Sequence, residues 1–172
     1  MNVHDVEKLF TRSDGTYLFA RWGRPIAPIV FGVDDATLSV VKSATEAIVV
    51  LAGHQMSETD PELGANLMTF FFREWDELIE APDLDQLIPD FGRLIARLKA
   101  VEANQYRLFH FDRSGAIKAA FVFVRMDEDM AQVPAEDVAL AQAAQTILSW
   151  SDQAFKDKGP LGRCLLYTSD AA

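Results

Sequence analysis

The fold is decided by residues 106–126, which have the sequence YRLFHFDRSGAIKAAFVFVRM. Two apolar and aromatic runs, 106–111 and 117–126, flank the four-residue stretch Asp112-Arg113-Ser114-Gly115. Strand-forming residues on both sides of a short connection with a late glycine are typical of a β-hairpin. The sequence therefore predicts two antiparallel strands joined by a short turn, and the other elements must be arranged around this hairpin.

The rest of the chain alternates between strand and helix patterns. Short apolar runs predict strands at 17–22, 26–33 and 67–72, and Pro25 and Pro28 push the second of these to a sheet edge. Helical spacing predicts a short helix that starts at Val3 and ends near Asp14-Gly15, and others from Asp34-Asp35 to Gly53, at 74–80, at 84–98 with a break at Pro89, and from Pro134 to about Phe155. We expect residues 1–158 to form a single α+β domain, a mixed, twisted sheet of about five strands packed with about four helices. Residues 159–172 follow as an exit loop and tail.

Composition and charge exclude several classes of protein. The 172 residues are 49% hydrophobic and include 16 Lys and Arg against 26 Asp and Glu, a net charge of -10. That much apolar surface excludes a disordered chain, and the negative charge argues against nucleic acid or an anionic membrane as a partner. No run of about 18 apolar residues could span a bilayer, and residues 1–8 lack the pattern of a secretory signal. We therefore expect a cytoplasmic protein.

The last nine residues, Cys164 to Ala172, resemble the translation of a sequencing-library adapter and are interpreted as a non-native tail. The alternative is a real acidic tail. If the tail is non-native, the natural continuation of the chain is lost at Cys164. The remaining 163 residues (172 minus 9) then have a net charge of -9, because Asp170 is removed. They contain no cysteine, which excludes thiol catalysis, disulfides and cysteine-ligated zinc.

The sequence shows none of the spacings that metal, phosphate or nucleophile sites require. His4, His54 and His110 do not form an i, i+4 metal pair. The acidic residues gather at element boundaries, where they cap helices and solvate loops. There is no glycine-rich phosphate loop and no Gly-x-Ser-x-Gly turn. We therefore predict no catalytic residue, no metal and no cofactor.

Three segments carry a resemblance to a known family, namely 22–26 (WGRPI), 65–78 (ANLMTFFFREWDEL) and 111–125 (FDRSGAIKAAFVFVR). Their order and spacing over residues 20–155 resemble a bacterial family, the domain of unknown function numbered 2927. The resemblance implies a zincin-like scaffold, in which the helix after the hairpin would carry metal ligands.

That helix departs from a metal site. Ala141 and Gln142 stand where the family has an acidic pair, while Gln145 keeps the family's glutamine. Alanine and glutamine can neither hold zinc nor deprotonate a zinc-bound water. The resemblance therefore implies a zincin-like fold without metal ligands. We expect Gln142 and Gln145 to be an exposed pair; if they are buried instead, they form a polar pocket whose amides need partners.

These features favour a non-catalytic binding or interaction module on a degenerate metallopeptidase-like scaffold, with a protein or a small molecule as its partner. The sheet edge beside the hairpin is the candidate surface, and the candidate binding residues are Gln142, Gln145, His110 and Asp112. One alternative is a hydrolase whose base is His54 or His110 beside an acid such as Asp112, which requires a histidine and a carboxylate to meet at a pocket mouth. Another is a homodimer built on an uncovered aromatic sheet face.

Overall fold

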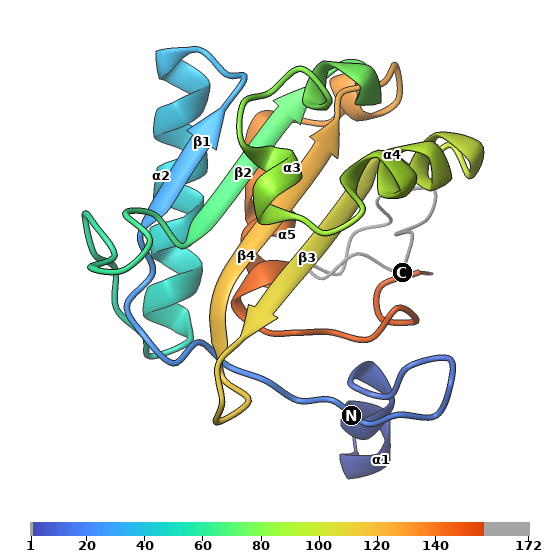
Figure 1. The fold of residues 1–172 in the computed structure, drawn as a ribbon. Helices are drawn as coiled ribbons and strands as arrows, with labels where there is room; N and C mark the ends of the chain where they lie inside the picture. Colours follow the sequence, from blue (N-terminus) through green and yellow to red (C-terminus); the bar gives the residue numbers. More distant parts are fainter. Residues whose placement is uncertain (1, 157–172) are drawn as a thin grey trace.

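In the computed structural model, which describes residues 2–156, the chain forms one α+β domain with a four-stranded sheet (Figure 1). The strands are β1 (Pro28–Phe31), β2 (Leu67–Phe72), β3 (Gln105–Phe111) and β4 (Ile117–Arg125). The α-helices are α1 (Val3–Leu9), α2 (Asp35–Leu51), α3 (Leu84–Leu87), α4 (Phe91–Ala100) and α5 (Ala135–Ile147). Two short 3-10 helices are η1 (Trp75–Leu78) and η2 (Met130–Gln132). The predicted α+β class is confirmed.

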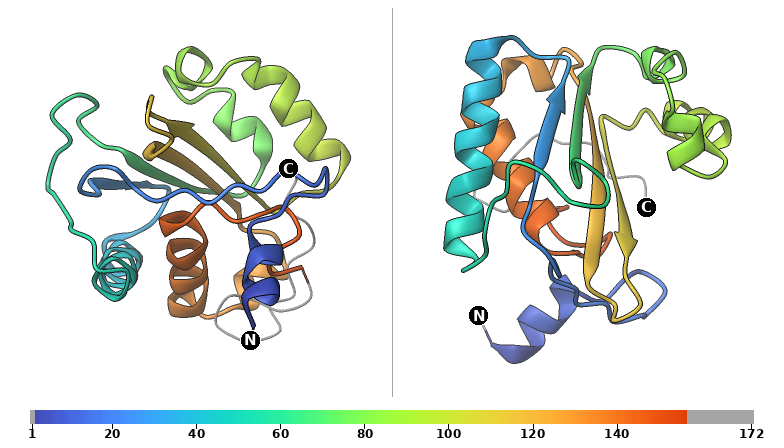
Figure 2. Two further views of the ribbon diagram at one scale, coloured as in Figure 1. Left: turned by 90° about the horizontal axis from the view of Figure 1, so that it is seen from below. Right: turned by 60° about the vertical axis from the view of Figure 1, so that its left-hand side comes forward.

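The sheet is mixed and has helices on both faces. Its strand order is β1-β2-β4-β3; β1, β2 and β4 run parallel, and β3 is antiparallel to β4. Helices α2 and α5 pack together on one face, and α3 and α4 cover the other (Figure 2). No helix described between residues 2 and 156 has the length and apolar character needed to cross a membrane.

The predicted hairpin is present as β3 and β4. The Asp112 carboxylate accepts hydrogen bonds from the backbone N–H groups of Ser114 at 2.8 Å and Ala116 at 3.1 Å, which holds the turn. Side chains of β3 alternate between the faces of the sheet. Tyr106 and Leu108 pack beneath α4, whereas the odd-numbered residues face α5.

Local sequence signals set several helix ends as predicted. Helix α2 begins after Asp34, whose carboxylate accepts a hydrogen bond from the N–H of Thr37 at 2.7 Å, an N-cap interaction. It ends just before Gly53. Pro89 separates α3 from α4, because proline cannot continue a helix. This division gives five α-helices in the described part of the chain, where about four were expected.

The predicted strand at 17–22 is wrong, and the sheet of the described residues therefore has four strands rather than about five. This stretch forms only isolated bridges, which join Tyr17 to Thr11, Arg21 to Leu148 and Trp22 to Ile117. Three single pairs with three different partners cannot build a ladder. The aromatic character of the stretch is used for packing instead, since Trp22 is buried and its indole N–H donates to the carbonyl of Thr146 at 3.0 Å.

The last predicted helix is too long, because α5 ends at Ile147 rather than Phe155. Leu148 is extended and forms one of the isolated bridges. The ring of Trp150 then stacks on that of Phe10, and the ring centroids are 4.6 Å apart. Packing against the first helix thus replaces the last turns of the predicted helix. The expected exit loop and non-native tail at 159–172 lie outside the described residues.

An aromatic ladder crosses the sheet on the α4 side. Rings of Phe31 and Phe70 stack at 4.7 Å, Phe70 and Phe123 at 5.3 Å, and Phe123 and Tyr106 at 6.5 Å. Phe70 and Phe123 are buried in the cluster that also contains residues of α3 and α4. The face offered by the sequence as a dimer surface is therefore covered at its centre, and at its margin on β1 Ile29 is 39% and Phe31 43% exposed.

Candidate functional site

The two edges of the sheet differ in their capacity to accept another strand. Strand β1 has four residues and begins with Pro28, which has no N–H to donate. The carbonyl of Ala27 accepts the N–H of Leu67 at 3.2 Å, so the backbone groups of Pro28 and Val30 point outward. Because Pro28 has no N–H, the outward N–H of this edge is that of Val30. A short strand with a proline resists pairing with a further strand. The prediction that the prolines place this run at a sheet edge is confirmed.

Strand β3, at the other edge, has seven residues and no proline. The N–H of Arg125 donates to the carbonyl of Asn104 at 2.7 Å, so the even-numbered residues of β3 bond to β4. The backbone groups of Gln105, Arg107 and Phe109 therefore point away from β4. Within residues 2–156, no backbone group bonds to those of Gln105 and Phe109 on this outer side. This edge can accept another strand.

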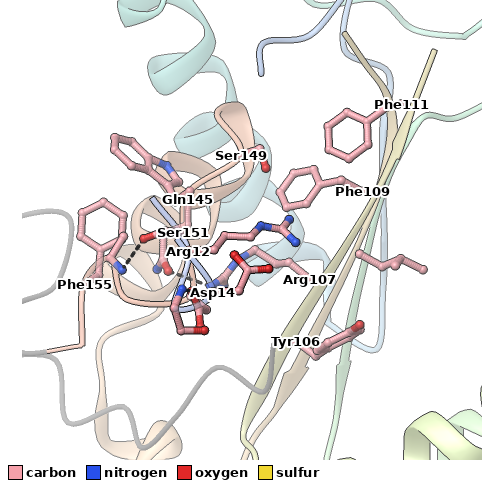
Figure 3. Close-up of a pocket in the computed structure, with 15 residues that line it drawn as sticks. Arg12, Asp14, Tyr106, Arg107, Phe109, Phe111, Gln145, Ser149, Ser151 and Phe155 are labelled. Atoms are coloured by element: carbon pink, nitrogen blue, oxygen red, sulfur yellow. Dashed lines mark hydrogen bonds between the residues drawn. The ribbon is translucent and has the colours of Figure 1, made fainter. Parts of the chain in front are cut away.

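A groove of about 370 Å³ runs along this edge (Figure 3), and we call it the β3 groove. Its first wall includes Tyr106 and Leu108, which face α4, as well as Arg107 and Phe109, which face α5. Only the edge of a strand presents residues of both faces to one space, so the groove follows the backbone of β3. The rest of its described lining consists of Arg12, Ser13, Asp14, Phe111, Gln145, residues 149–152, Ala154 and Phe155.

The wall opposite β3 is built jointly by the turn after α1 and the segment after α5. The N–H of Ser13 donates to the Asp152 carboxylate at 2.9 Å, and the N–H of Ser151 donates to the carbonyl of Leu9 at 3.0 Å. Trp150 adds the ring stacking described above and donates its indole N–H to a carbonyl of α5 at 3.1 Å. The groove is therefore closed by segments from both ends of the described chain.

Both signs of charge line the groove. Arg12 enters it from the turn after α1 and Arg107 from β3 (Figure 3). Burial raises the pKa of Asp152, but hydrogen bonds from Ser13 and its own neighbours outweigh burial and hold that pKa below its ordinary value. A backbone hydrogen bond within its own turn likewise lowers the pKa of Asp14. Both carboxyl groups are therefore ionised near neutral pH.

Of the predicted glutamine pair, Gln145 belongs to the lining of the β3 groove, and Gln142 lies three residues before it on α5. Gln142 and Gln145 are each 4% exposed, so the expectation of an exposed pair is wrong. Arg107 donates to Gln142 Oε1 at 3.0 Å and to Gln145 Oε1 at 2.8 Å. The Nε2 of Gln142 donates to Gln105 Oε1 at 2.9 Å. Buried amides require such partners, and β3 supplies them because its alternation places Gln105 and Arg107 on the face toward α5.

The structure does not bring the other two predicted residues, His110 and Asp112, to this network. The ring of His110 lies 5.5 Å from that of Phe121, on the other face of β3. The Asp112 carboxylate is held in the hairpin turn, where its hydrogen bond with the Ser114 hydroxyl and those from backbone N–H groups lower its pKa. Neither residue is part of the described lining of the β3 groove.

Described residues do not form the histidine and carboxylate pair that the hydrolase alternative requires. The Nε2 of His54 lies 2.7 Å from the carbonyl oxygen of Arg24. The described residues do form one histidine-carboxylate contact. It joins His4 Nδ1 and Glu7 Oε2 at 3.8 Å on the exposed helix α1. Residues 2–156 also contain no group of three or more His, Cys, Asp or Glu side chains placed to hold a metal ion.

A second polar cluster, around Asp60, has a structural role. Asp60 is 4% exposed and accepts hydrogen bonds from the N–H groups of Glu62 and Leu63, both at 2.9 Å, and from Asn66 Nδ2 at 3.0 Å. Its carboxylate also lies 3.2 Å from Arg24 Nη1. Burial raises the pKa of Asp60, but these hydrogen bonds outweigh burial and lower it to about 2. Since Asn66 also bonds to the backbone just before β1, the cluster fixes the loop that precedes β2.

In comparisons with known proteins, no family model, no curated protein and no solved structure matches the chain. The resemblance to the domain family numbered 2927, and the zincin-like part of the fold prediction, therefore stay predictions.

Reasoning from the sequence missed Gln105, Arg107 and Arg12. A signal existed for Arg107, because it lies two residues from Phe109 in a predicted strand and therefore shares a face with it. Gln105 lies one residue before that predicted strand. No local sequence pattern indicates that Arg12 or the segment 149–155 lines a site. They reach the groove only through contacts between the two ends of the described chain.

Proposed function

We propose that this domain is a non-catalytic, cytoplasmic interaction module that binds an extended peptide segment of another protein along the outer edge of β3. The observation that carries the proposal is the outward-facing backbone of Gln105 and Phe109 beside the β3 groove. A peptide that adds a strand to an open edge gains main-chain hydrogen bonds, and pockets for its alternate side chains supply specificity. Strand β1 begins with Pro28 and resists pairing with a further strand, so β3 is the edge that can be extended.

The lining of the groove favours a peptide with an apolar or aromatic side chain next to charged ones. Phe109, Trp150 and Phe155 supply apolar surface, and aromatic rings are frequent anchors in binding pockets. Arg12 and Asp14 are exposed at the rim and can each pair with a side chain of opposite charge. Rim pairs of this kind steer and orient a partner more than they add affinity.

Amide hydrogen exchange, followed by NMR, tests the proposal directly. In the free protein the N–H groups of Gln105 and Phe109 should exchange faster than those of Tyr106 and Leu108, which bond to β4. A peptide selected from a displayed library of short random sequences should slow the exchange at Gln105 and Phe109 by about tenfold or more, and leave Tyr106 and Leu108 unchanged.

Two substitutions at one position separate strand addition from side-chain contact. Phe109→Pro removes the outward N–H, while Phe109→Val removes the ring and keeps the N–H. We expect the proline variant to weaken peptide binding by about tenfold or more and the valine variant by only a few-fold. Equal losses in both variants, or selected peptides that leave the edge amides unprotected, would overturn the proposal. Protection of these amides without peptide, together with a dimeric mass in sedimentation, would assign the edge to a second copy and also overturn it.

A further inference from the structure

A second pocket, of about 430 Å³, lies between α2 and α5 at the carboxyl ends of the parallel strands β1, β2 and β4. These strand ends are at the top of Figure 1. Its walls include Val33 after β1, Phe71 of β2, Met126 after β4 and Val133 before α5. In sheets with helices on their faces, ligands bind outside the carboxyl ends of parallel strands. A volume of this size lies within the range of roughly 300–1,000 Å³ that small-molecule sites occupy.

The interior of this pocket is apolar and reaches the centre of the sheet. Phe71 belongs to an interior strand and faces the helices, yet it is only half-buried, because the pocket opens onto its ring. Met126 and Val133 are half-buried in the same way, and Val138 forms part of the buried floor. These side chains present apolar surface that a ligand can remove from water.

One charged side chain, that of Asp34, belongs to the described lining, and no lysine or arginine does. Asp34 is exposed, and its Oδ1 accepts the N–H of Thr37 at 2.7 Å, which fixes the carboxylate in place. Backbone hydrogen bonding from Thr37 lowers the pKa of Asp34, so the group is an anion at neutral pH. The residues next to the lining, Asp35 and Glu136, are exposed and acidic as well, so the rim attracts cations.

We propose that this pocket binds a small amphiphilic amine, with its ammonium group at the Asp34 carboxylate and its apolar chain against Phe71, Met126 and Val133. Charge complementarity selects the head group. A carboxylate on the ligand would meet Asp34 and its acidic neighbours. A neutral alcohol would gain the apolar contact and one hydrogen bond to the carboxylate, but not the attraction between two opposite charges. The proposal is independent of the β3 groove, because Asp34, Phe71, Met126 and Val133 are not part of that groove's lining.

Three probes with the same alkyl chain test the proposal, namely hexylamine, hexanol and hexanoate, titrated into the full-length protein and followed by amide chemical shifts. Hexylamine should bind with a dissociation constant of about 1 mM, as expected for so small a ligand, and shift the amides of Val33, Phe71 and Met126. Hexanol should bind about fivefold to tenfold more weakly, and hexanoate more weakly still. Hexanoate binding at least as tightly as hexylamine, or hexylamine shifts confined to other parts of the protein, would overturn the proposal.

Two variants locate the head group and the chain. Asp34→Asn keeps a side-chain oxygen for the N-cap and removes the charge. Hexylamine should then bind this variant only as tightly as hexanol does, while the affinity for hexanol is unchanged. Ala135→Phe, at an exposed position in the mouth of the pocket, should abolish the binding of hexylamine and of hexanol. If Ala135→Phe does not fold, Ala131→Phe takes its place, because Ala131 is also an exposed residue of the lining. An unchanged preference for hexylamine in Asp34→Asn, or unchanged binding in a folded mouth variant, would refute the assignment.

Discussion

Replacing Asp60 by Asn should make the stability of this protein less dependent on pH in the acid range. In the folded state burial raises the pKa of Asp60, but hydrogen bonds from Leu63, Glu62 and Asn66, together with Arg24, lower it from 3.8 to about 2. A carboxyl group with a lower pKa in the folded than in the unfolded state stabilises the fold while it is ionised. That stabilisation is complete above the unfolded pKa and is lost as the pH falls through the folded pKa.

The structure sets the size of the effect. The difference between 3.8 and about 2 corresponds to about 2.4 kcal/mol, at about 1.36 kcal/mol for each pKa unit. The cluster lies near the surface, where solvent screens charges, so we expect about 1–2 kcal/mol to be lost between about pH 4 and about pH 2. In the Asp60→Asn variant the side-chain NH₂ faces donors from Arg24 and Asn66, which adds a loss of about 1–3 kcal/mol that does not depend on this titration.

Urea unfolding followed by tryptophan fluorescence measures the free energy of unfolding of both proteins from about pH 6 to about pH 2.5. The difference between wild-type protein and Asp60→Asn should shrink by about 1 kcal/mol or more as the pH falls. Glu62→Gln is the matched control, because Glu62 belongs to the same cluster but its side chain is 53% exposed. A difference that stays constant with pH, or an equal pH dependence in Glu62→Gln, would refute the reasoning.

Four further substitutions test the packing. Gly32→Ala should destabilise the protein by about 3 kcal/mol or more, because its Cβ would lie 1.9 Å from a carbonyl oxygen of β2 at a φ of +82°. Gly15→Ala, with a φ of +83° and no atom within 4 Å, should cost only about 1 kcal/mol, and equal urea midpoints for the two variants would contradict this account. Gln142→Leu should lower the free energy of unfolding by about 1–3 kcal/mol, because Arg107 loses a buried acceptor; a loss below about 0.5 kcal/mol in thermal unfolding would show that the network does not stabilise the fold. Phe121→Ala should cost about 3–5 kcal/mol by calorimetry, since the ring is fully buried in the core, and a loss of about 1 kcal/mol would contradict that packing.

Elements were predictable from the sequence where a few neighbouring residues decide the backbone. Asp34 starts α2 because its carboxylate accepts a hydrogen bond from within the same turn. Pro89 divides two helices because it lacks an N–H, and Asp112 holds the hairpin turn within four residues of itself. The stretch 17–22 and the end of α5 were mispredicted for the opposite reason. Their aromatic residues, Trp22 and Trp150, pack against segments that are distant in the sequence.

The candidate site was predictable only in part. Gln142 and Gln145 could be singled out because two amides three residues apart on a helix share one side, but their burial depends on Arg107, which lies 35 and 38 residues away. The far wall of the β3 groove depends on the bond between Ser13 and Asp152, which are 139 residues apart. No local pattern encodes such a contact. His110 was predicted from its residue type and its place in the hairpin near Asp112, but the alternation of β3 places it on the other face.

The unequal edges of the sheet also limit how copies of this protein can associate. Two copies that paired through β3 would form one continuous sheet with two-fold symmetry, and each outer end of that sheet would be a short β1 strand beginning with Pro28. Such an assembly is closed, because a proline-bearing edge does not recruit the next strand. Growth would therefore stop at the dimer instead of continuing into a filament. A peptide on β3 and a second copy would also compete for the same backbone groups, so partner binding would hold the protein monomeric.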